Sequence, residues 1–384
     1  MNSLKFAKHL SIRLFLVVIF VLPLFAGLTT PVQADDDDDD DRGAVRVVYT
    51  ITNAAEGNEV VVFQRSSNGS LSMQETVSTG GLGSGTGLGS QGAVLLREND
   101  RRLFVVNTGS NQISVFAVRN RGLDLLDVVD SGGIMPISLT IHGRILYVLN
   151  AGGSGNISGF GVRENGKLVP LEGSTQPLSN AGVGDSPQPA QVSFHPNGNL
   201  LVVTEKATNL ITTYEVKGGI AQPPTTNPSA GMTPFGFAFG MRNNLIVSEA
   251  FGGAPDASAM SSYIVNEDTF ELMSASVPTT QTAACWVVIT NNGKYAYTTN
   301  TGSGSISSYQ IAKDGSITLL DAQAGLTGDG SMPIDMAFSN DSRYLYAIGA
   351  GSSAIHIFRV QADGSLKSLD EVSVPPGSLG LAAR

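Results

Sequence analysis

The chain repeats one pattern of hydrophobic and polar positions about every fifty residues, seven times in all. Each copy holds a short apolar segment, a tight turn, a second apolar segment ending in small polar residues, an alternating segment, a Gly turn and a last segment. The clearest copies are LVVTEKATNLITTYEV (201–216), YAYTTNTGSGSISSYQI (295–311) and LYAIGAGSSAIHIFRV (345–360). Four short strands per repeat are typical of a propeller blade. The sequence therefore predicts an all-β, seven-bladed β-propeller with four-stranded blades.

The first segment of each repeat is apolar at nearly every position, which indicates a strand packed on both faces. We expect these segments to be the inner strands of the ring. The third segments alternate, as at Ile355 and Ile357 with polar neighbours. Short turns such as Asn165-Gly166 and Asp314-Gly315 supply the positive φ that hairpins need. The expected inner strands are 92–96, 137–141, 190–194, 235–239, 286–289 and 334–338.

The two ends of the repeat array complement each other. The first recognisable strand, 45–51, matches a second strand of the repeat, so its blade lacks a first strand. The missing strand reappears at the C-terminus as SLGLAA, residues 378–383. We expect this strand to pair into the first blade and close the ring, because closure removes the open edges of a linear array.

The N-terminus has the pattern of an export signal. A basic start precedes an apolar stretch at 14–28 and the small-residue site Val32-Gln33-Ala34, so residues 1–34 are predicted to be a cleaved signal peptide and the protein to be secreted or periplasmic. An uncleaved membrane anchor is disfavoured, since the stretch is short and contains Pro23. Residues 35–44 begin with seven aspartates and are predicted to form an acidic disordered tail. Calcium capture, the alternative, would require a folded loop. The propeller would span 45–384.

The net charge limits the classes of partner, and the cysteine content bears on disulfides. Loss of Lys5, Lys8 and Arg13 with the leader takes the formal net charge from −10 to −13. This argues against nucleic acid and against anionic membrane surfaces as partners, and no membrane insertion is expected after cleavage. Cys285 is the only cysteine, so no internal disulfide is available. A small-molecule ligand, a lactone or a protein remains as partner.

The predicted loops are long on one side of the disc only. Loops between blades, at 80–90, 178–189, 222–233 and 323–332, and one second-to-third loop at 249–259 are rich in Gly, Pro and Ser. In the predicted strand order all of them share one face, named here the long-loop face. The opposite, short-loop face carries tight turns. Function is expected on the long-loop face, where the Gly-rich stretch 80–92 is expected to be a flexible loop, since no helix follows it to bind a phosphate.

Histidine chemistry is not expected. His142 and His195 fall in first-to-second turns on the short-loop face, and His356 lies on a third strand. We interpret all three as structural or surface residues, so neither a His-based triad nor a His-ligated metal site is predicted. No cofactor is predicted either, because one tryptophan cannot supply the repeated docking used by quinone-dependent propellers.

Candidate site residues gather on the long-loop face. Glu205 and Glu249 end second strands at equivalent positions, so a shared rim is expected. A carboxylate can act as a general base and a lysine can stabilise an oxyanion, which makes Glu205 and Lys206 the predicted catalytic pair. The alternative is that these residues solvate the rim or bind backbone between blades. The predicted ligand-binding residues are Glu249, Gln191, Trp286, Asp335 and Asn300, with Asp185 nearby; for Trp286, space-filling between blades is the alternative.

The motifs HPNGNLLVV, YAYTTNTGSGSISSYQIAKDGSITLL and RYLYAIGAGSSAIHIFRVQADGSL resemble the seven-bladed propeller lactonase family, across residues 45–384. That family includes bacterial 6-phosphogluconolactonases and fungal carboxymuconate cyclases. The resemblance implies the predicted fold and lactone hydrolysis. It also matches the family's Asp after the second strand to Glu205. The sugar-lactonase branch carries Pro-His and Pro-Arg-His on inner strands, where this chain has Pro189-Ala190 and Ala284-Cys285-Trp286.

Two functions follow, of which lactone hydrolysis is the leading prediction. One is a lactone hydrolase acting in the central funnel with Glu205 as base and Lys206 as electrostatic partner. The other is a non-catalytic, exported propeller that binds a ligand or a protein. Retention of a carboxylate at 205 favours the enzyme, whereas loss of the family's imidazoles and arginine favours the binding protein.

Overall fold

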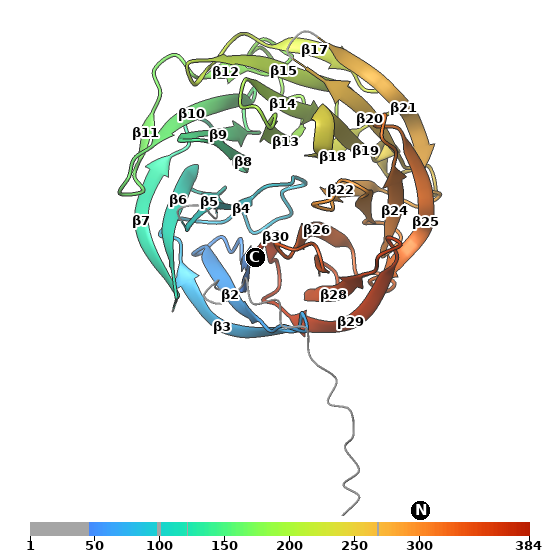
Figure 1. The fold of residues 1–384 in the computed structure, drawn as a ribbon. Coiled ribbons are helices and arrows are strands. Elements are labelled where there is room, and N and C mark those ends of the chain that lie inside the picture. Colours follow the sequence, from blue (N-terminus) through green and yellow to red (C-terminus); the bar gives the residue numbers. More distant parts are fainter. Residues whose placement is uncertain (1–45, 98–100, 121, 267–268) are drawn as a thin grey trace, which may run out of the picture. The chain divides into compact units, whose positions relative to one another are not determined.

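The computed structural model describes residues 46–97, 101–120, 122–266 and 269–384. Residues 1–44 and 45–384 separate into two units, and the second holds all the described residues. The predicted signal peptide and the Asp35–Asp41 run lie outside the described residues. Figure 1 shows the second unit as a ring of radiating sheets.

Seven antiparallel sheets make up the ring, and the innermost strand is given first for each. Blade 1 has β30 (Leu379–Ala383), β1 (Val47–Ile51), β2 (Glu59–Arg65) and β3 (Leu71–Ser78). Blade 2 has β4 (Val94–Arg97), β5 (Arg102–Asn107), β6 (Gln112–Arg119) and β7 (Gly122–Asp130). Blade 3 has β8 (Pro136–His142), β9 (Ile145–Asn150) and β10 (Asn156–Val162) with a broken outer strand, β11 (Leu168–Pro170) and β12 (Gln176–Pro177). Blade 4 has β13 (Pro189–Phe194), β14 (Leu200–Glu205) and β15 (Leu210–Lys217) with a broken outer strand, β16 (Ile220–Ala221) and β17 (Thr225–Pro228). Blade 5 has β18 (Pro234–Phe239), β19 (Asn244–Glu249), β20 (Ala259–Val265) and β21 (Phe270–Pro278); blade 6 has β22 (Ala284–Ile289), β23 (Tyr295–Asn300), β24 (Ser305–Ile311) and β25 (Ile317–Leu326); blade 7 has β26 (Pro333–Phe338), β27 (Tyr344–Gly349), β28 (Ala354–Val360) and β29 (Leu366–Ser373). The predicted seven four-stranded blades are confirmed.

Burial follows strand position within a blade. Second strands such as β14 are buried throughout, while outer strands such as β3 are largely exposed. The third strands differ from expectation: β6 and β24 are buried on both faces. In β6 the alternation is between large and small residues, as at Ile113, Ser114 and Val115, and it lets neighbouring sheets approach closely.

The C-terminal strand closes the ring as predicted. β30 pairs antiparallel with β1, with Val48 opposite Ala383 and Tyr49 opposite Ala382. The hydroxyl of Thr50 donates to the carbonyl oxygen of Leu379 at 2.9 Å. The ring therefore has no disulfide but is joined by backbone pairing between its two ends, since Cys285 is free and buried.

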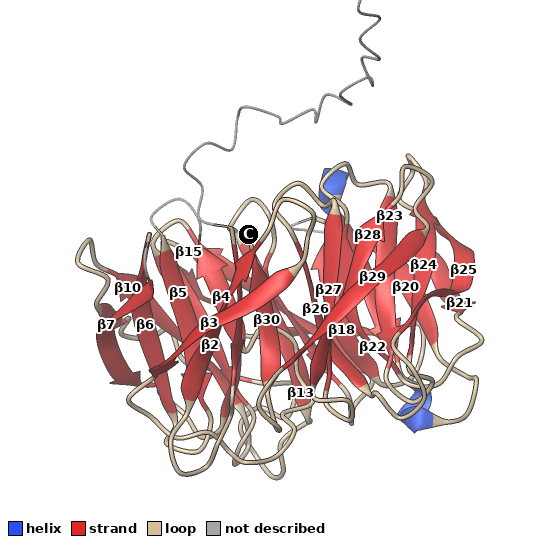
Figure 2. Ribbon diagram, turned by 90° about the horizontal axis from the view of Figure 1, so that it is seen from below, coloured by secondary structure: helices blue, strands red, loops and turns tan. Residues whose placement is uncertain are grey.

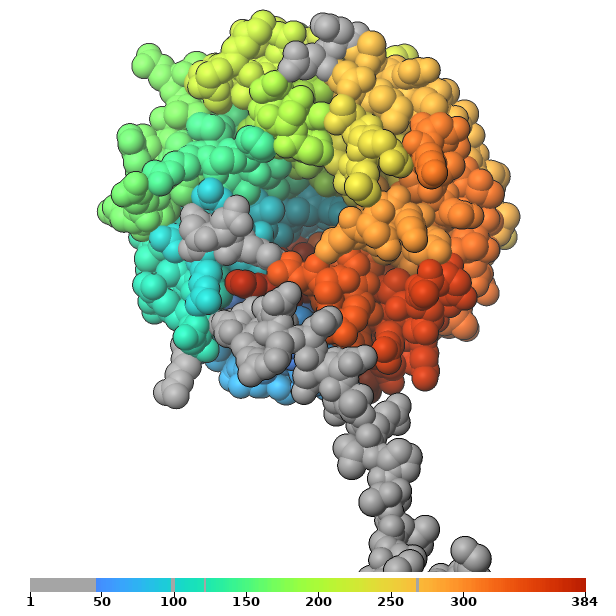
Figure 3. All heavy atoms as spheres, viewed as in Figure 1, coloured from blue at the N-terminus to red at the C-terminus, as the bar shows by residue number. Residues whose placement is uncertain are grey.

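The two faces of the ring differ in their loops. The short 3₁₀ segment η3 (Phe251–Gly253) follows β19 in a second-to-third loop, at the face that also holds the inter-blade loops, and Figure 2 shows the two short helical segments in blue at opposite faces. The segment η2 (Met241–Asn243), in a first-to-second turn, lies at the other face. This short-loop face is hollowed at the middle of the ring (Figure 3). The sorting of loops derived from the sequence holds for the described residues.

Candidate functional site: the centre of the long-loop face

The segment that joins blade 1 to blade 2 crosses the axis of the ring. Ser90 and Gln91, just before β4, bond to blades on the opposite side. The Gln91 side-chain amide donates to the carbonyl oxygen of Val287 at 2.8 Å and accepts from its N–H at 3.1 Å. The Trp286 indole donates to the carbonyl oxygen of Ser90 at 2.9 Å. Because blades 2 and 6 are as far apart as two blades of a seven-membered ring can be, this segment spans the channel.

Further bonds hold the crossing segment to blades 3 and 4. The N–H of Gln91 donates to Ala190 O at 3.1 Å, and the Ser90 hydroxyl donates to Ile137 O at 2.9 Å. The expectation that 80–92 is a flexible loop was therefore wrong for its last residues. Gly92 has φ of +90°, and a Cβ there would lie 2.9 Å from the Ser138 hydroxyl oxygen, so this position requires glycine. Backbone and amide groups of Ser90 and Gln91 therefore tie the inner strands of blades 3, 4 and 6 together.

An apolar cluster surrounds the crossing segment. It consists of Ala190, Phe235, Ala250, Cys285 and Trp286, all buried. The Phe235 and Trp286 rings lie 5.0 Å apart at 53°. The resemblance to sugar lactonases places imidazole and guanidinium groups where this chain has Ala190, Cys285 and Trp286. These positions do lie together, but here they form an apolar floor.

Lys206 is the cation of this centre. Its ammonium lies 4.7 Å from the centroid of the Phe235 ring and donates to Gly89 O at 2.7 Å. Burial lowers the pKa of Lys206 to about 8, because the charged form is poorly solvated there. Burial also raises the pKa of the neighbouring Cys285 thiol to about 12, so the thiol stays protonated. Lys206 thus lies in an apolar environment and has a pKa close to neutral pH.

Glu205 precedes Lys206 but faces a different environment. Its side chain is fully buried and accepts from Ser179 N at 3.0 Å, Thr212 Oγ1 at 2.8 Å, Thr208 Oγ1 at 3.0 Å and the Ser179 hydroxyl. These partners belong to blade 4 and to the loop that enters it. Every carboxylate oxygen therefore has two donors. The bonds support the alternative in which Glu205 binds groups between blades, and its role as a base stays a prediction.

Glu249 and Asn300 repeat this arrangement in blades 5 and 6. Glu249 accepts from Gly231 N at 2.8 Å, from the Ser276 hydroxyl at 2.7 Å and from the Ser261 hydroxyl. Burial raises the pKa of Glu249, opposed by these bonds. The Asn300 amide donates to the hydroxyls of Ser305 and Ser307. Each side chain serves its own blade, so the structure does not bring Glu205, Glu249 and Asn300 together around one ligand.

Gln191 and Asp335 join neighbouring inner strands. The Gln191 amide accepts from Phe237 N at 2.7 Å and donates to Phe237 O at 3.0 Å, which links β13 to β18. Asp335 accepts from Leu381 N at 3.1 Å and from Met336 N at 2.8 Å, which links β26 to β30. Burial raises the pKa of Asp335 to about 8. Both side chains bind backbone rather than an open cavity.

The histidines lie away from this centre. β13 begins opposite Glu205 and ends at Phe194, so His195 lies at the other end of the strand, where its ring contacts Val265 O at 3.1 Å. His142 is exposed and packs on Phe194. His356 lies 3.3 Å from the Glu371 carboxylate. Within the described ranges, no group of three or more His, Cys, Asp or Glu side chains could hold a metal ion.

Of the residues at this centre, Lys206 and Trp286 were named from the sequence, whereas Phe235, Ser90 and Gln91 were not. Phe235 sits in the predicted inner strand and carried no sign of a contact with a cation. Ser90 and Gln91 were hidden in a Gly-rich stretch, whose partners come from blades far along the chain. No local pattern specifies such contacts.

Comparisons with known proteins agree with the propeller fold. The sequence model "Lactonase, 7-bladed beta-propeller" matches residues 44–177 and 249–381. A candidate 6-phosphogluconolactonase of Bacteroides uniformis is 16% identical, with 89% of this chain and 100% of that chain covered and a TM-score of 0.69. The periplasmic gluconolactonase of Pseudomonas aeruginosa is 16% identical, with 88% and 99% covered and a TM-score of 0.66. A protein of Lactobacillus plantarum has a TM-score of 0.70 at 13% identity, with 88% of this chain and 99% of that chain covered.

The curated proteins contain no match to this chain. In the part of the chain that the structure describes, no helix is long and apolar enough to cross a membrane. The matched segments cover more than half of the chain and leave out 178–248, which contain Gln191, Glu205, Lys206 and Phe235. The resemblance seen in the sequence is confirmed: this chain belongs to the lactonase family of seven-bladed β-propellers.

Proposed function

We propose that this lactonase-family propeller is an exported, non-catalytic scaffold that binds a protein partner through its long-loop face. The observation that carries the proposal is the exposure of one large apolar side chain on each of five inter-blade loops. These are Leu82 (42% exposed), Ile134 (57%), Val183 (75%), Met232 (55%) and Met332 (48%). All five loops belong to the long-loop face, and the proposal assigns their exposed apolar side chains to contact with the partner.

The centre of the same face supports the non-catalytic part of the proposal. A hydrolase needs a free base beside the substrate. Here the carboxylates of Glu205, Glu249 and Asp335 are buried and bound to donors of the ring itself. Export rests on the N-terminal signal pattern and agrees with the periplasmic location named for one structural relative.

A photo-crosslinking amino acid tests the proposal in cells that produce the protein. Placed at Val183 or Met232, it should give a discrete covalent adduct with another protein. Leu272, on the outer strand β21, is a matched control because its exposure of 47% is similar. Absence of an adduct at the two loop positions, or equal adducts at Leu272, would count against a docking face on the long-loop side.

Lactone hydrolysis is the second candidate function, and the position of Lys206 favours it. An amine with a pKa near 8 over an apolar floor could take a proton from water that attacks a lactone carbonyl. In this alternative Glu205 would assist only after release from its four donors. A panel of gluconolactone, 6-phosphogluconolactone and a simple butyrolactone, assayed with and without calcium, tests it.

The scaffold proposal predicts no turnover above spontaneous hydrolysis. Turnover by the unchanged protein that Lys206→Met abolishes, and that the exposed His142→Ala variant retains, would make the hydrolase the better assignment. Emission from Trp286, the chain's single tryptophan, would report whether a lactone reaches the centre at all.

A further inference from the structure

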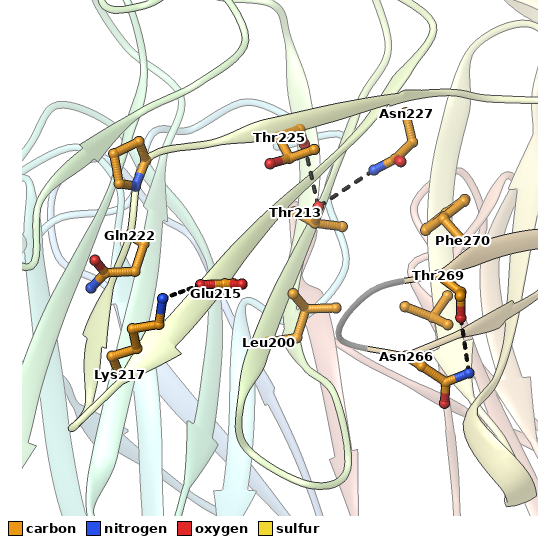
Figure 4. Close-up of a pocket in the computed structure, with 12 residues that line it drawn as sticks. Leu200, Thr213, Glu215, Lys217, Gln222, Thr225, Asn227, Asn266, Thr269 and Phe270 are labelled. Atoms are coloured by element: carbon orange, nitrogen blue, oxygen red, sulfur yellow. Dashed lines mark hydrogen bonds and ion pairs between the residues drawn. The ribbon is translucent and has the colours of Figure 1, made fainter.

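A groove of about 450 Å³ lies between the outer halves of blades 4 and 5 (Figure 4). It exists because the outer strand of blade 4 is broken. β16 ends at Ala221, Pro223 and Pro224 follow, and β17 begins at Thr225. Proline has no N–H for a strand ladder, so the chain leaves the edge of β15 at this point. Blades 5, 6 and 7 carry continuous outer strands instead.

One wall of the groove is polar and ordered by strand geometry. Thr213, Glu215 and Lys217 are alternate residues of β15, so their side chains share one face. Figure 4 shows Thr213 beside Thr225 and Asn227 of β17, and Glu215 and Lys217 on the side of Gln222. The Asn227 amide donates to Ile211 O at 3.1 Å and lies 3.4 Å from the Thr213 hydroxyl. This wall therefore presents fixed hydroxyl and amide groups.

Charge in the groove is balanced. Among the described residues that line it, the charged side chains are Glu215 and Lys217, and they form an ion pair at 2.5 Å. Both remain largely exposed, with 48% and 70% of their side chains accessible. A ligand with a full charge would have to break this pair, whereas hydroxyl groups can bond to both of its members.

The opposite wall contains one aromatic residue, Phe270. Phe270 opens β21, is half-buried and packs 4.8 Å from the Tyr263 ring. Leu200 and Val265 form the base, but only 5% and 0% of their surfaces are accessible. The apolar area left for a ligand is therefore small and flat. An apolar ligand would gain little from burial here.

We infer that this groove binds a neutral saccharide of one or two rings. Hydroxyl and amide side chains both donate and accept, as adjacent sugar hydroxyls require. Phe270 would cover the C–H face of a pyranose ring. The volume falls within the range of about 300–1,000 Å³ typical of small-ligand sites. The polar wall comes from residues within 178–248, which lie outside the family match. It is independent of the function proposed for the long-loop face.

Titration calorimetry and saturation-transfer NMR with glucose, galactose, maltose, cellobiose and lactose test the inference on the whole protein. At least one sugar should bind with a millimolar or tighter Kd. Phe270→Leu should weaken binding roughly tenfold or more because it removes the ring face, while Phe270→Tyr should retain it. Glu215→Gln should weaken binding, and Glu271→Gln, on the neighbouring residue outside the groove, should not.

Melting temperatures of the variants separate loss of fold from loss of binding, and Phe270→Tyr with Glu271→Gln serve as folded controls. The inference is overturned if no sugar binds, or if Phe270→Leu and Glu215→Gln bind like the unchanged protein. Tighter binding of glucose 6-phosphate or of a neutral tetrapeptide than of any neutral sugar would also overturn it.

Discussion

Replacing Glu205 by Ala and by Gln distinguishes a structural carboxylate from a catalytic one. Glu205→Ala removes the acceptor of four donors, of which the Thr212 hydroxyl is fully buried and the Ser179 N–H is part-buried. Glu205→Gln keeps one acceptor oxygen for these two donors. Its amide can donate to the hydroxyls of Ser179 and Thr208, which rotate to accept. Other blades already place an amide here, as at Asn107, which bonds Asn58, Thr79 and Ser114.

The expected losses in the free energy of unfolding differ severalfold between the two variants. A buried donor left without a partner costs about 1–3 kcal/mol, so two such donors place the loss for Glu205→Ala near ~4 kcal/mol. Glu205→Gln should cost less than about 1.5 kcal/mol, since its bonds are rearranged rather than removed. With an unfolding entropy of ~2.1 cal/mol/K per residue, a ring of this size should lose about 5–6 °C in Tm for Glu205→Ala and about 2 °C or less for Glu205→Gln.

Urea denaturation gives the free energies, and differential scanning calorimetry gives the melting temperatures. Glu249→Ala and Glu249→Gln provide a matched pair in the next blade, because Glu249 holds Gly231 and Ser276 in the same way. A Glu205→Ala variant as stable as the unchanged protein would refute the structural role. If a lactone is turned over, a loss of ~100-fold in Glu205→Gln with an unchanged Tm would restore the predicted base.

Three further predictions concern closure, pH and the N-terminal tail. Deletion of residues 377–384 removes β30 and should cause early melting or aggregation; a full-length melting temperature in the truncated protein would contradict closure by this strand. Because Asp335 has a folded-state pKa of about 8, above its unfolded value, its protonation stabilises the fold fully below pH 4 and this contribution is lost as pH rises to 8. Urea titrations from pH 5 to 8 should show that the free energy of unfolding declines with pH, and that this decline is shallower in Asp335→Asn by about 1.4 kcal/mol per pH unit. An identical slope in the unchanged protein and the variant would argue against a proton on buried Asp335. Replacement of Asp35–Asp41 by Ser and Gly should leave Tm and any calorimetric calcium signal unchanged, and loss of such a signal with the tail would indicate a calcium site there.

The fold could be read from the sequence because propeller blades are specified locally. Apolar inner strands, Gly-bearing hairpins and a fifty-residue period each arise within one repeat, and the strand missing near residue 45 matched SLGLAA at 378–383. The sorting of loops onto two faces followed from strand order alone. It correctly assigned His195 to the end of its strand away from Glu205.

The site depended on tertiary contacts that no repeat specifies. Glu205 and Lys206 are adjacent, yet one contacts the loop entering its own blade and the other contacts Gly89 and Phe235. Successive positions of an extended chain point in opposite directions, so adjacency in sequence did not imply a shared site. The equivalence of Glu205 and Glu249 meant instead that each fills the same structural position in its own blade.

The sequence by itself determined the blades, their number, the closing strand and the two kinds of face, because periodicity and turn chemistry act over short distances. Only the tertiary structure decided that Ser90 and Gln91 cross the axis and that the buried carboxylates accept hydrogen bonds from groups of the ring. It also decided that a broken outer strand opens a groove beside Phe270. These features join residues from different blades, and their hydrogen bonds exist only once the ring has brought those blades together.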